Sequence, residues 1–344
     1  MLYTKLGNSD LKVSRICLGG MGFGNSRTGQ HTWTVNKNDT LLIVRKALDA
    51  GINFFDTAIA YQKGTGEEYL GDALKQSVAR DRVVIATKFL PRSAEDIQNE
   101  ISGQQHIERQ LTKSLEHLKT DYVDLYIYHM WDYHTPMHDI LEGLDLQIKK
   151  GRIRYIGIAN CFAWQLAEIN ALARAEGFSE FVSVQNHYNL IFREEEREMS
   201  GLCREKNIAV TPYSPLASGR LSRLPDTVTR RMQEDSYAHL KYDAAAQEDA
   251  KIILRLKETA DQYEASMTQT ALAWLLTKAD APVVGASRAS QIDDMQKACD
   301  LKLDPLDIHY LEELYRPHPL VGVMAQNTVS SDESTLVWMQ NRAR

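Results

Sequence analysis

Four ionisable side chains follow three successive apolar runs in the first 130 residues of the chain. They are Asp56 at the end of INFFD, Tyr61 five residues further on, Lys88 at the end of VVIATK, and His129 at the end of VDLYIYH. A free tyrosine has a pKa of about 10 and is a reluctant proton donor. A neighbouring ammonium group stabilises the phenolate, and a positioned acid typically raises a rate by about 10² to 10⁴. The four side-chain types therefore favour proton transfer to a substrate oxygen.

Each of the four residues has a distinct expected role. Tyr61 is the proton donor, Lys88 stabilises its phenolate, and Asp56 keeps Lys88 charged and correctly oriented. His129, as a neutral imidazole donor, orients the substrate oxygen. Taken singly, they also fit a helix cap, a half-buried aromatic, a solvated strand end and a core histidine. Their joint placement at three successive strand ends favours the catalytic interpretation.

Eight apolar runs recur along the chain, with segments of helical periodicity between them. The runs span residues 15–19, 52–56, 83–88, 123–129, 154–160, 181–185, 208–213 and 281–286, and the helix candidates include 39–50, 107–117, 136–149, 164–176 and 194–206. We interpret the acidic run REEERE at 193–198 as the solvated start of the last of these helices. The alternation, without a linker, predicts an α/β fold with a single closed (β/α)8 TIM barrel. The C-terminal ends of its strands would form one rim.

Three segments depart from the repeat. Residues 2–14 read as a β-hairpin that closes the barrel floor. Residues 216–246 form a long segment without strong periodicity, which we expect to close over a ligand. Beyond residue 318 the composition turns polar, so we expect a barrel over 1–318 and a C-terminal tail over 319–344. A lid or a homo-oligomer contact are the candidate roles for that tail.

Composition limits the classes of partner. Hydrophobic residues make up 43% and charged residues 25% of the 344 positions, as in a soluble globular protein. The formal net charge of -6 provides no basic surface for nucleic acid or anionic membrane, so a small molecule is the expected partner. The four cysteines are far apart without a CxxC pair, which predicts no disulfide framework, no metal site and a cytoplasmic setting. No secretory leader or membrane span is expected.

The four side chains and the motifs around them resemble the aldo-keto reductase family, whose Asp, Tyr, Lys and His tetrad matches Asp56, Tyr61, Lys88 and His129. The resemblance covers about residues 1–318. Its further motifs are LGNSDLKVSRICLGGMGFG at the start, GIAN (157–160), QNHYNL (185–190), YSPLASGRL (213–221) and VGASRASQIDD (284–294). It implies an oxidoreductase of the EC 1.1.1 class that reduces aldehydes or ketones to alcohols by hydride transfer from NADPH.

The cofactor is not expected to occupy a Rossmann fold, because GGMGFG at 19–24 lacks the G-x-G-x-x-G spacing and does not lead straight into a helix. The family instead lays NADPH in extended form across the barrel mouth. The resemblance places Asn160 and Gln185 at the carboxamide and Tyr213 beneath the nicotinamide ring. An amide pair can match the carboxamide's donor and acceptor, and an aromatic face offers a flat apolar platform.

The resemblance also implies contacts to the rest of the cofactor. These are Ser214, Leu216, Ser218 and Arg220 around the pyrophosphate, and Gly285, Ser287, Arg288, Gln291 and Asp294 at the adenosine end. The guanidinium of Arg288 can bind a 2′-phosphate with two hydrogen bonds, which favours NADPH over NADH. Two positions depart from the family pattern: Ala159 stands where a serine is common, and Met295 stands where an adenine-binding asparagine is common. Each departure removes one polar contact to the cofactor.

The sequence also suggests residues for a substrate pocket and leaves two alternative functions open. The loop aromatics expected to line a carbonyl pocket are Trp33, Trp131, Tyr133 and Phe23. A lysine at a barrel strand end can also form a Schiff base, so Lys88 could serve a lyase, although Tyr61 and Asp56 argue against that chemistry. The third candidate is a regulatory NADPH-binding subunit with little turnover, such as the potassium-channel β subunits of the same family.

Overall fold

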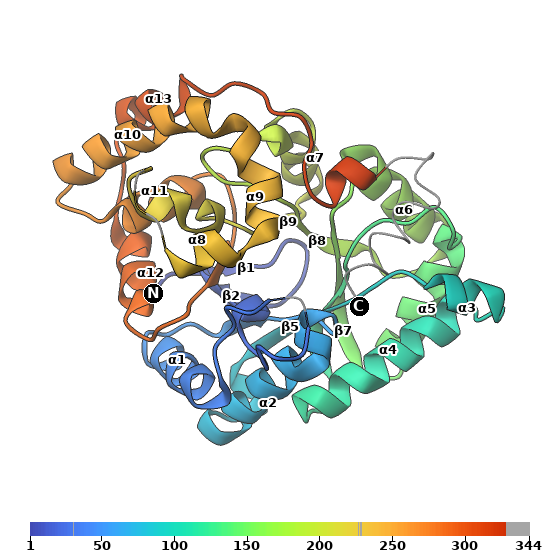
Figure 1. Cartoon of the computed structure of the whole chain (residues 1–344). Coiled ribbons are helices and arrows are strands. Elements are labelled where there is room, and N and C mark those ends of the chain that lie inside the picture. The colour runs from blue at the N-terminus through green and yellow to red at the C-terminus, as the bar shows by residue number, and fades with distance from the viewer. Residues whose placement is uncertain (30, 226, 228, 328–344) are drawn as a thin grey trace.

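A parallel eight-stranded barrel forms the centre of the computed structural model, which describes residues 1–29, 31–225, 227 and 229–327. In sheet order the strands are β10 (Val283–Gly285), β3 (Cys17–Gly19), β4 (Phe54–Asp56), β5 (Val84–Phe89), β6 (Val123–Tyr128), β7 (Ile153–Ala159), β8 (Phe181–Gln185) and β9 (Ala209–Val210). The ring closes between the two ends of this order, because Asp280 N donates to Val210 O and Val283 N donates to Pro212 O. The predicted TIM barrel is confirmed (Figure 1).

Amphipathic helices surround the strands (Figure 1). They are α1 (Lys37–Asp49), α2 (Thr65–Ser77), α4 (Gly103–Leu118), α5 (Met137–Lys149), α6 (Ala163–Glu176), α7 (Met199–Lys206), α10 (Ala246–Gln262), α11 (Met267–Leu276), α12 (Gln291–Asp300) and α13 (Pro305–Glu312), with the short α3 (Ala94–Gln98) between β5 and α4. Asn36 begins α1 by accepting two backbone hydrogen bonds, and Ser102 begins α4 through a capping box. Among the described residues, no helix is long and apolar enough to cross a membrane.

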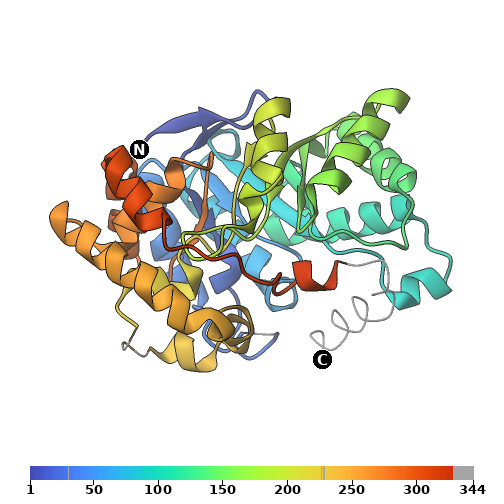
Figure 2. The ribbon, with the colours of Figure 1, turned by 90° about the horizontal axis from the view of Figure 1, so that it is seen from above.

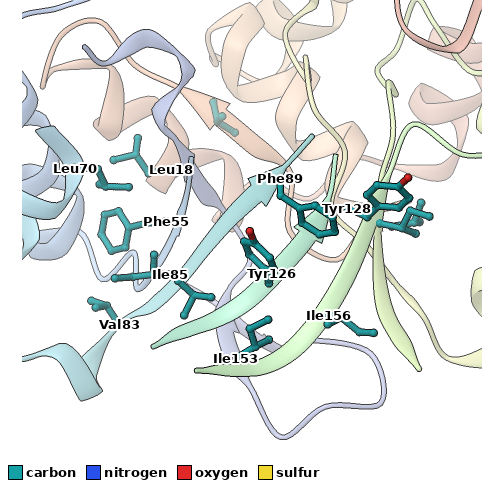
Figure 3. Close-up of a cluster of buried hydrophobic side chains, with 14 of the residues drawn as sticks. Leu18, Phe55, Leu70, Val83, Ile85, Phe89, Tyr126, Tyr128, Ile153 and Ile156 are labelled. Carbon is teal, nitrogen blue, oxygen red and sulfur yellow. The ribbon is translucent and has the colours of Figure 1, made fainter. Parts of the chain in front are cut away.

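Alternation along the strands separates two apolar layers. Phe55, Ile85 and Tyr126 belong to the cluster between strands and helices, where Phe89 stacks on Tyr126 and on Tyr128 at 4.8 and 5.1 Å between ring centroids (Figure 3). Their sequence neighbours belong to a second cluster inside the barrel, which includes Phe54, Val84, Ala86, Leu125 and Ile127. The same two-residue period continues this inner series to Asp56, Lys88, His129 and Gln185. It therefore brings polar groups to the barrel mouth.

The N-terminal hairpin closes the opposite end of the barrel, as predicted. Its strands are β1 (Tyr3–Lys5) and β2 (Lys12–Ser14), and Figure 2 shows it on the side away from α9. Leu6 and Leu11 are fully buried in the inner cluster. The turn approaches the strand ends so closely that a β-carbon on Gly7, whose φ is +53°, would lie 2.4 Å from Val182 O.

The segment 216–246 differs from the expectation of an irregular loop. Its described residues contain a 3-10 turn at Ala217–Ser222 and two short helices, α8 (Arg230–Glu234) and α9 (Ser236–Tyr242). The helices are too short to show a periodic pattern in the sequence. Asp235 caps α9 by accepting from Ala238 N, and α9 packs beside the barrel mouth (Figure 1).

The interpretation of REEERE as the start of a helix is wrong, and the run is solvated only in its second half, at 196–198. The structure has a 3-10 turn at Glu194–Glu196, and α7 begins only at Met199. Glu195 Oε2 accepts from Asn186 Nδ2 at 2.7 Å, and Glu194 Oε1 accepts from Tyr315 OH at 2.8 Å. Burial raises the pKa of Glu195 to about 7. Partners outside the run hold these two acids inward, and the local charge pattern carries no sign of them.

The start of the expected tail runs around the outside of the barrel to the loops that follow β6 and β7 (Figure 1). Residues 319–327 run to a 3-10 turn, η7 (Met324–Gln326), beside α6 (Figure 1). Asn327 is 6% exposed and forms hydrogen bonds with residues of the β6 and β7 loops. The rest of the expected tail, 328–344, lies outside the described residues.

Candidate active site

Lys88 is the centre of a buried charged cluster at the mouth of the barrel. Its Nζ donates to Asp56 Oδ1 at 2.5 Å, to Thr57 O at 2.7 Å and to Tyr61 OH at 3.4 Å. Lys88 and Asp56 are 1% and 2% exposed, so water screens their attraction little. The structure thus brings together three of the four predicted catalytic residues within hydrogen-bonding distance.

Backbone geometry fixes the position of Tyr61. The residue begins the 3-10 turn η2 (Tyr61–Gly64), in which Gln62 and Lys63 have φ of +49° and +54°. Such left-handed residues cost energy and cluster at functional sites. Gln62, which the sequence did not single out, is buried and donates through Nε2 to Asn25 O and His31 O. It holds the loop after β3 against the tyrosine.

The pKa values of the cluster follow from burial and from the ion pair. Burial raises the pKa of Tyr61 above its usual 10 by more than Lys88 lowers it, so a net depression, as the sequence suggested, is not found. Burial disfavours the charge of Lys88, but Asp56 and Tyr61 outweigh it and raise the pKa of that lysine. Lys88 therefore stays protonated, which disfavours it as a Schiff-base nucleophile.

His129 completes the predicted tetrad from the end of β6. Its ring lies edge-on to the Tyr61 ring, at 6.0 Å between centroids. Burial, with a contribution from Lys88, lowers the pKa of His129 to about 3, so the imidazole is neutral. Its Nδ1 is buried and has no hydrogen-bond partner in the part of the chain that the structure describes. Because an unpaired N–H costs more than an unpaired lone pair, we assign the proton to Nε2, where it can be donated to a substrate oxygen.

Asn160, Gln185 and Tyr213, the three residues expected at the nicotinamide, are each held by hydrogen bonds at the barrel mouth. Asn160 Nδ2 donates to His129 O at 2.8 Å, and Tyr213 OH donates to Asn160 Oδ1 at 2.9 Å. Gln185 Nε2 donates to Asp56 Oδ2 at 3.0 Å. Asn160 has φ of +54°, a conformation that asparagine tolerates better than most residues. The three side chains are thus pre-ordered against the tetrad.

A column of parallel rings supports Tyr213. His187 stacks on Tyr213 at 5.4 Å, Phe192 stacks on His187 at 4.1 Å, and His318 stacks on Phe192 at 6.0 Å, all within 16° of parallel. Burial lowers the pKa of His187 well below its usual value, so this ring is neutral. The column fixes the plane of the Tyr213 ring. Because His187 covers one face, the platform expected for the nicotinamide is the opposite face.

The segment expected to bind the pyrophosphate has an unusual backbone. Ser214, Ala217 and Ser218 have φ of +55°, +47° and +56°. Leu216 O accepts from Gly219 N at 2.8 Å, which tightens the turn. Lys241 of α9, another residue that the sequence did not single out, is 6% exposed and donates from Nζ to Ser214 Oγ at 2.8 Å. Its charge lies at the segment expected to hold an anion.

Arg220 provides a second cation and an unused donor in the same segment. Its Nη2 donates to Asp243 Oδ1 at 2.9 Å, and its guanidinium lies over the Tyr242 ring at 4.8 Å. Its Nη1 is buried without a hydrogen-bond partner among the described residues. A buried unpaired donor is costly, so this atom fits a bound phosphate oxygen.

The adenosine end is organised by Gln291. Its Oε1 accepts from Ser287 N, from Ser287 Oγ and from Arg288 N, which orders the turn between Gly285 at the end of β10 and the start of α12. Arg288 is exposed. Burial, and then the charge of Arg288, lowers the pKa of Arg223. The sequence alone did not single out Arg223, whose pKa responds to the charge of Arg288.

Two further residues at this end contribute to the fold: Asp294, which was expected at the cofactor, and Met295, which departs from the family pattern. Asp294 Oδ1 accepts from Ser266 Oγ and from Gln269 Nε2, so this oxygen links α12 to the first turn of α11. Met295 is 2% exposed in the outer apolar core. The position at which the family often has an asparagine is therefore filled by packing here.

The aromatic residues expected around the substrate differ in their placement. Phe23 is fully buried in the outer core and has no exposed surface to offer a substrate, so that expectation is wrong. Trp131 is 7% exposed, lies edge-on to Trp164, and has an indole N–H without a partner among the described residues. Trp33 lies against His31 at 4.8 Å, on the loop that Gln62 holds, and Tyr133 donates to Asn327.

A parallel barrel with a buried Asp–Lys–Tyr cluster at its mouth defines the class of site, one built for proton transfer in a water-poor environment. Comparison with known proteins then gives the family. The model of the aldo/keto reductase family matches residues 15–316.

The chain is 35% identical to versiconal hemiacetal acetate reductase of Aspergillus parasiticus, over 93% of this chain and 99% of that protein. It is 35% identical to a putative aryl-alcohol dehydrogenase of Schizosaccharomyces pombe, over 93% and 97%. The crystal structure of the thermostable aldo-keto reductase Tm1743 with the inhibitor epalrestat matches at a TM-score of 0.74 and 26% identity, over 91% of this chain and all of that one. The chain therefore belongs to the aldo/keto reductase family, as its motifs indicated, and is an oxidoreductase acting on small-molecule carbonyl compounds.

Proposed function

We propose that the protein is an NADPH-dependent reductase of aldehydes or ketones, of the EC 1.1.1 class and cytoplasmic, in which Tyr61 gives the proton. The 3.4 Å contact between Lys88 Nζ and Tyr61 OH carries this proposal, because it pairs the acid with the cation that stabilises its conjugate base. When bound, NADPH supplies the hydride. Tyr61 donates its proton to the carbonyl oxygen, and His129 Nε2–H orients that oxygen.

Residues of this chain fit the expected nicotinamide cofactor. Asn160 and Gln185 present amide groups for the carboxamide, and Tyr213 offers a supported flat face. Arg220 Nη1 is a donor without a partner in the described part of the chain, and it belongs to the pyrophosphate segment that also carries the charge of Lys241. These features favour a dinucleotide that lies across the barrel mouth.

The preference for NADPH over NADH rests on a pair of arginines. Burial is the larger cause of the lowered pKa of Arg223, and repulsion by the charge of Arg288 is the second. A 2′-phosphate would remove that repulsion and accept hydrogen bonds from both groups. A bare ribose hydroxyl would do neither.

The substrate is proposed to be an aromatic or otherwise bulky carbonyl compound. Trp131 has an indole N–H without a partner among the residues that the structure describes, and Trp33 and Tyr133 lie on loops at the same end of the barrel. Two of the relatives bear the names of an aryl-alcohol dehydrogenase and a hemiacetal acetate reductase, which agrees with a pocket of this kind.

NADPH oxidation, followed by absorbance against a panel of aromatic, aliphatic and sugar-derived carbonyls, tests the proposal. We expect turnover with at least one class, and the best substrates among the aromatic aldehydes. Tight NADPH binding with negligible turnover across the panel would instead support a regulatory subunit. Borohydride trapping of substrate on Lys88, without NADPH oxidation, would support a Schiff-base lyase.

A further inference from the structure

The side-chain amide of Asn327 joins three segments at the barrel mouth. Its Oδ1 accepts from Tyr133 OH and from Gln165 Nε2, both at 3.0 Å. Its Nδ2 donates to Gln165 Oε1 at 2.8 Å and to Asn160 O at 3.3 Å. All four hydrogen-bonding positions of the amide are therefore used. Asn327 is 6% exposed and Gln165 is fully buried, so water competes little for these bonds.

Gln165 and Asn327 form a reciprocal amide pair, since each donates to and accepts from the other. Tyr133 OH closes the ring by accepting from Gln165 Nε2 at 3.0 Å. Gln165 Oε1 also accepts from Phe162 N at 2.8 Å, which ties the pair to the start of α6. A surface tail has no need of such a closed and buried network.

The bond to Asn160 O connects this network with the cofactor site. The peptide that follows Asn160 is held from both sides, because Asn327 binds its carbonyl and Asn186 Oδ1 accepts from its N–H at 3.4 Å. Asn160 has a left-handed backbone, which costs energy unless its surroundings enforce it. Its side chain is in turn placed between His129 O and Tyr213 OH.

We propose that Asn327 is a positioning residue: it locks the Asn160 peptide for the nicotinamide carboxamide and fixes Tyr133 at the substrate pocket. This inference rests on the proposed function, in which Asn160 contacts the cofactor. It assigns to the C-terminal segment a part in both cofactor binding and substrate choice. The lock acts on the nicotinamide half of the cofactor and leaves the adenosine half unaffected.

Two ligands distinguish the nicotinamide half of the cofactor site from its adenosine half. NADP⁺ engages both ends of the site, whereas 2′,5′-ADP carries only the adenosine end and its phosphate. For Asn327→Ala, we expect fluorescence titration to give about tenfold weaker binding of NADP⁺ and unchanged binding of 2′,5′-ADP. Tyr133→Phe keeps the ring and loses the two hydrogen bonds of its hydroxyl, but it leaves the bond from Asn327 to Asn160 O in place, so it should weaken NADP⁺ binding to a smaller extent.

Two shortened chains provide a matched control. A chain that ends at Asn327 retains the network and should bind NADP⁺ as the full chain does. A chain that ends at Val323 removes η7 and Asn327, and should reproduce the loss seen in Asn327→Ala. It should also raise KM for an aromatic aldehyde more than for a small aliphatic one, with kcat changed less than KM.

If Asn327→Ala weakens the binding of NADP⁺ and of 2′,5′-ADP equally, the variant has a general loss of structure and the inference is overturned. Unchanged binding of both ligands would also overturn it. Asn160→Ala serves as the benchmark. If Asn160→Ala leaves NADP⁺ binding intact, the proposed cofactor contact itself fails. If Asn160→Ala weakens binding and Asn327→Ala does not, only the positioning role fails.

Discussion

Lys88 Nζ lies 3.4 Å from Tyr61 OH and 2.5 Å from Asp56 Oδ1, so the tyrosine shares its cation with a closer carboxylate. The two contacts of Lys88 have different consequences. Asp56 keeps Lys88 charged, and the longer contact leaves the tyrosine proton free to move to a substrate. Lys88 gains a stronger partner when Tyr61 becomes a phenolate.

Replacement of Tyr61 by phenylalanine should abolish proton donation and leave the cofactor site intact. We expect kcat for carbonyl reduction to fall by a factor of about 10² to 10⁴. NADPH binding, measured by fluorescence quenching, should be unchanged. Tyr310→Phe on the exposed face of α13 is the matched control. Near-native turnover in Tyr61→Phe would eliminate the proposed acid.

Lys88→Met should raise the pKa of Tyr61 further, because Lys88 is the group that opposes the effect of burial. In the alcohol-oxidation direction the phenolate accepts the proton, so the rate in the native protein should increase with pH up to about 10 and beyond. In the variant the same rise should begin at higher pH, with at least about a hundredfold loss at pH 9. A pH profile that is unchanged in position would contradict the assigned role of Lys88.

Arg288→Ala and Arg223→Ala should each raise KM for NADPH by about tenfold to a hundredfold, because each removes a charge-assisted hydrogen bond to the 2′-phosphate. KM for NADH should change less than about twofold in both variants. Arg45→Ala, on the exposed side of α1, controls for loss of surface charge. Equal effects on the two cofactors would remove the arginine pair from the 2′-phosphate site.

Glu195→Gln should stabilise the protein at neutral and higher pH. The ordinary pKa of this carboxyl is 4.5, and burial raises it to about 7 in the folded state. The folded form thus retains a proton that the unfolded form releases, so stability falls as pH increases from 4.5 to 7 and the penalty is complete above 7. The glutamine still accepts from Asn186 and has no charge to bury.

We expect Glu195→Gln to gain about 3 kcal/mol at pH 8 by denaturant unfolding, and little at pH 4.5. Glu198→Gln at an exposed position of the same segment serves as the control. A gain of the same size at both pH values would show that the effect comes from packing and that the raised pKa has no part in it.

Much of the barrel was readable from the sequence because its strands are short, apolar and regularly spaced. Asp56, Lys88 and His129 were singled out because each ends such a strand, and parallel strands end at one rim. Phe23 shows the limit of that reasoning, since a loop aromatic beside a strand can equally turn into the core. The residues in REEERE were misread for a similar reason, because their partners Asn186 and Tyr315 are invisible to local pattern.

The sequence by itself determined the repeat, the order of the elements and the identity of the groups at the strand ends. Only the tertiary structure decided the direction of the Tyr61 pKa, because desolvation depends on what covers a group in space. It also decided the contacts of Lys241, Gln62 and Asn327, which join segments far apart along the chain. Hydrogen bonds and charge pairs act over a few ångströms, and the fold alone sets which groups come that close.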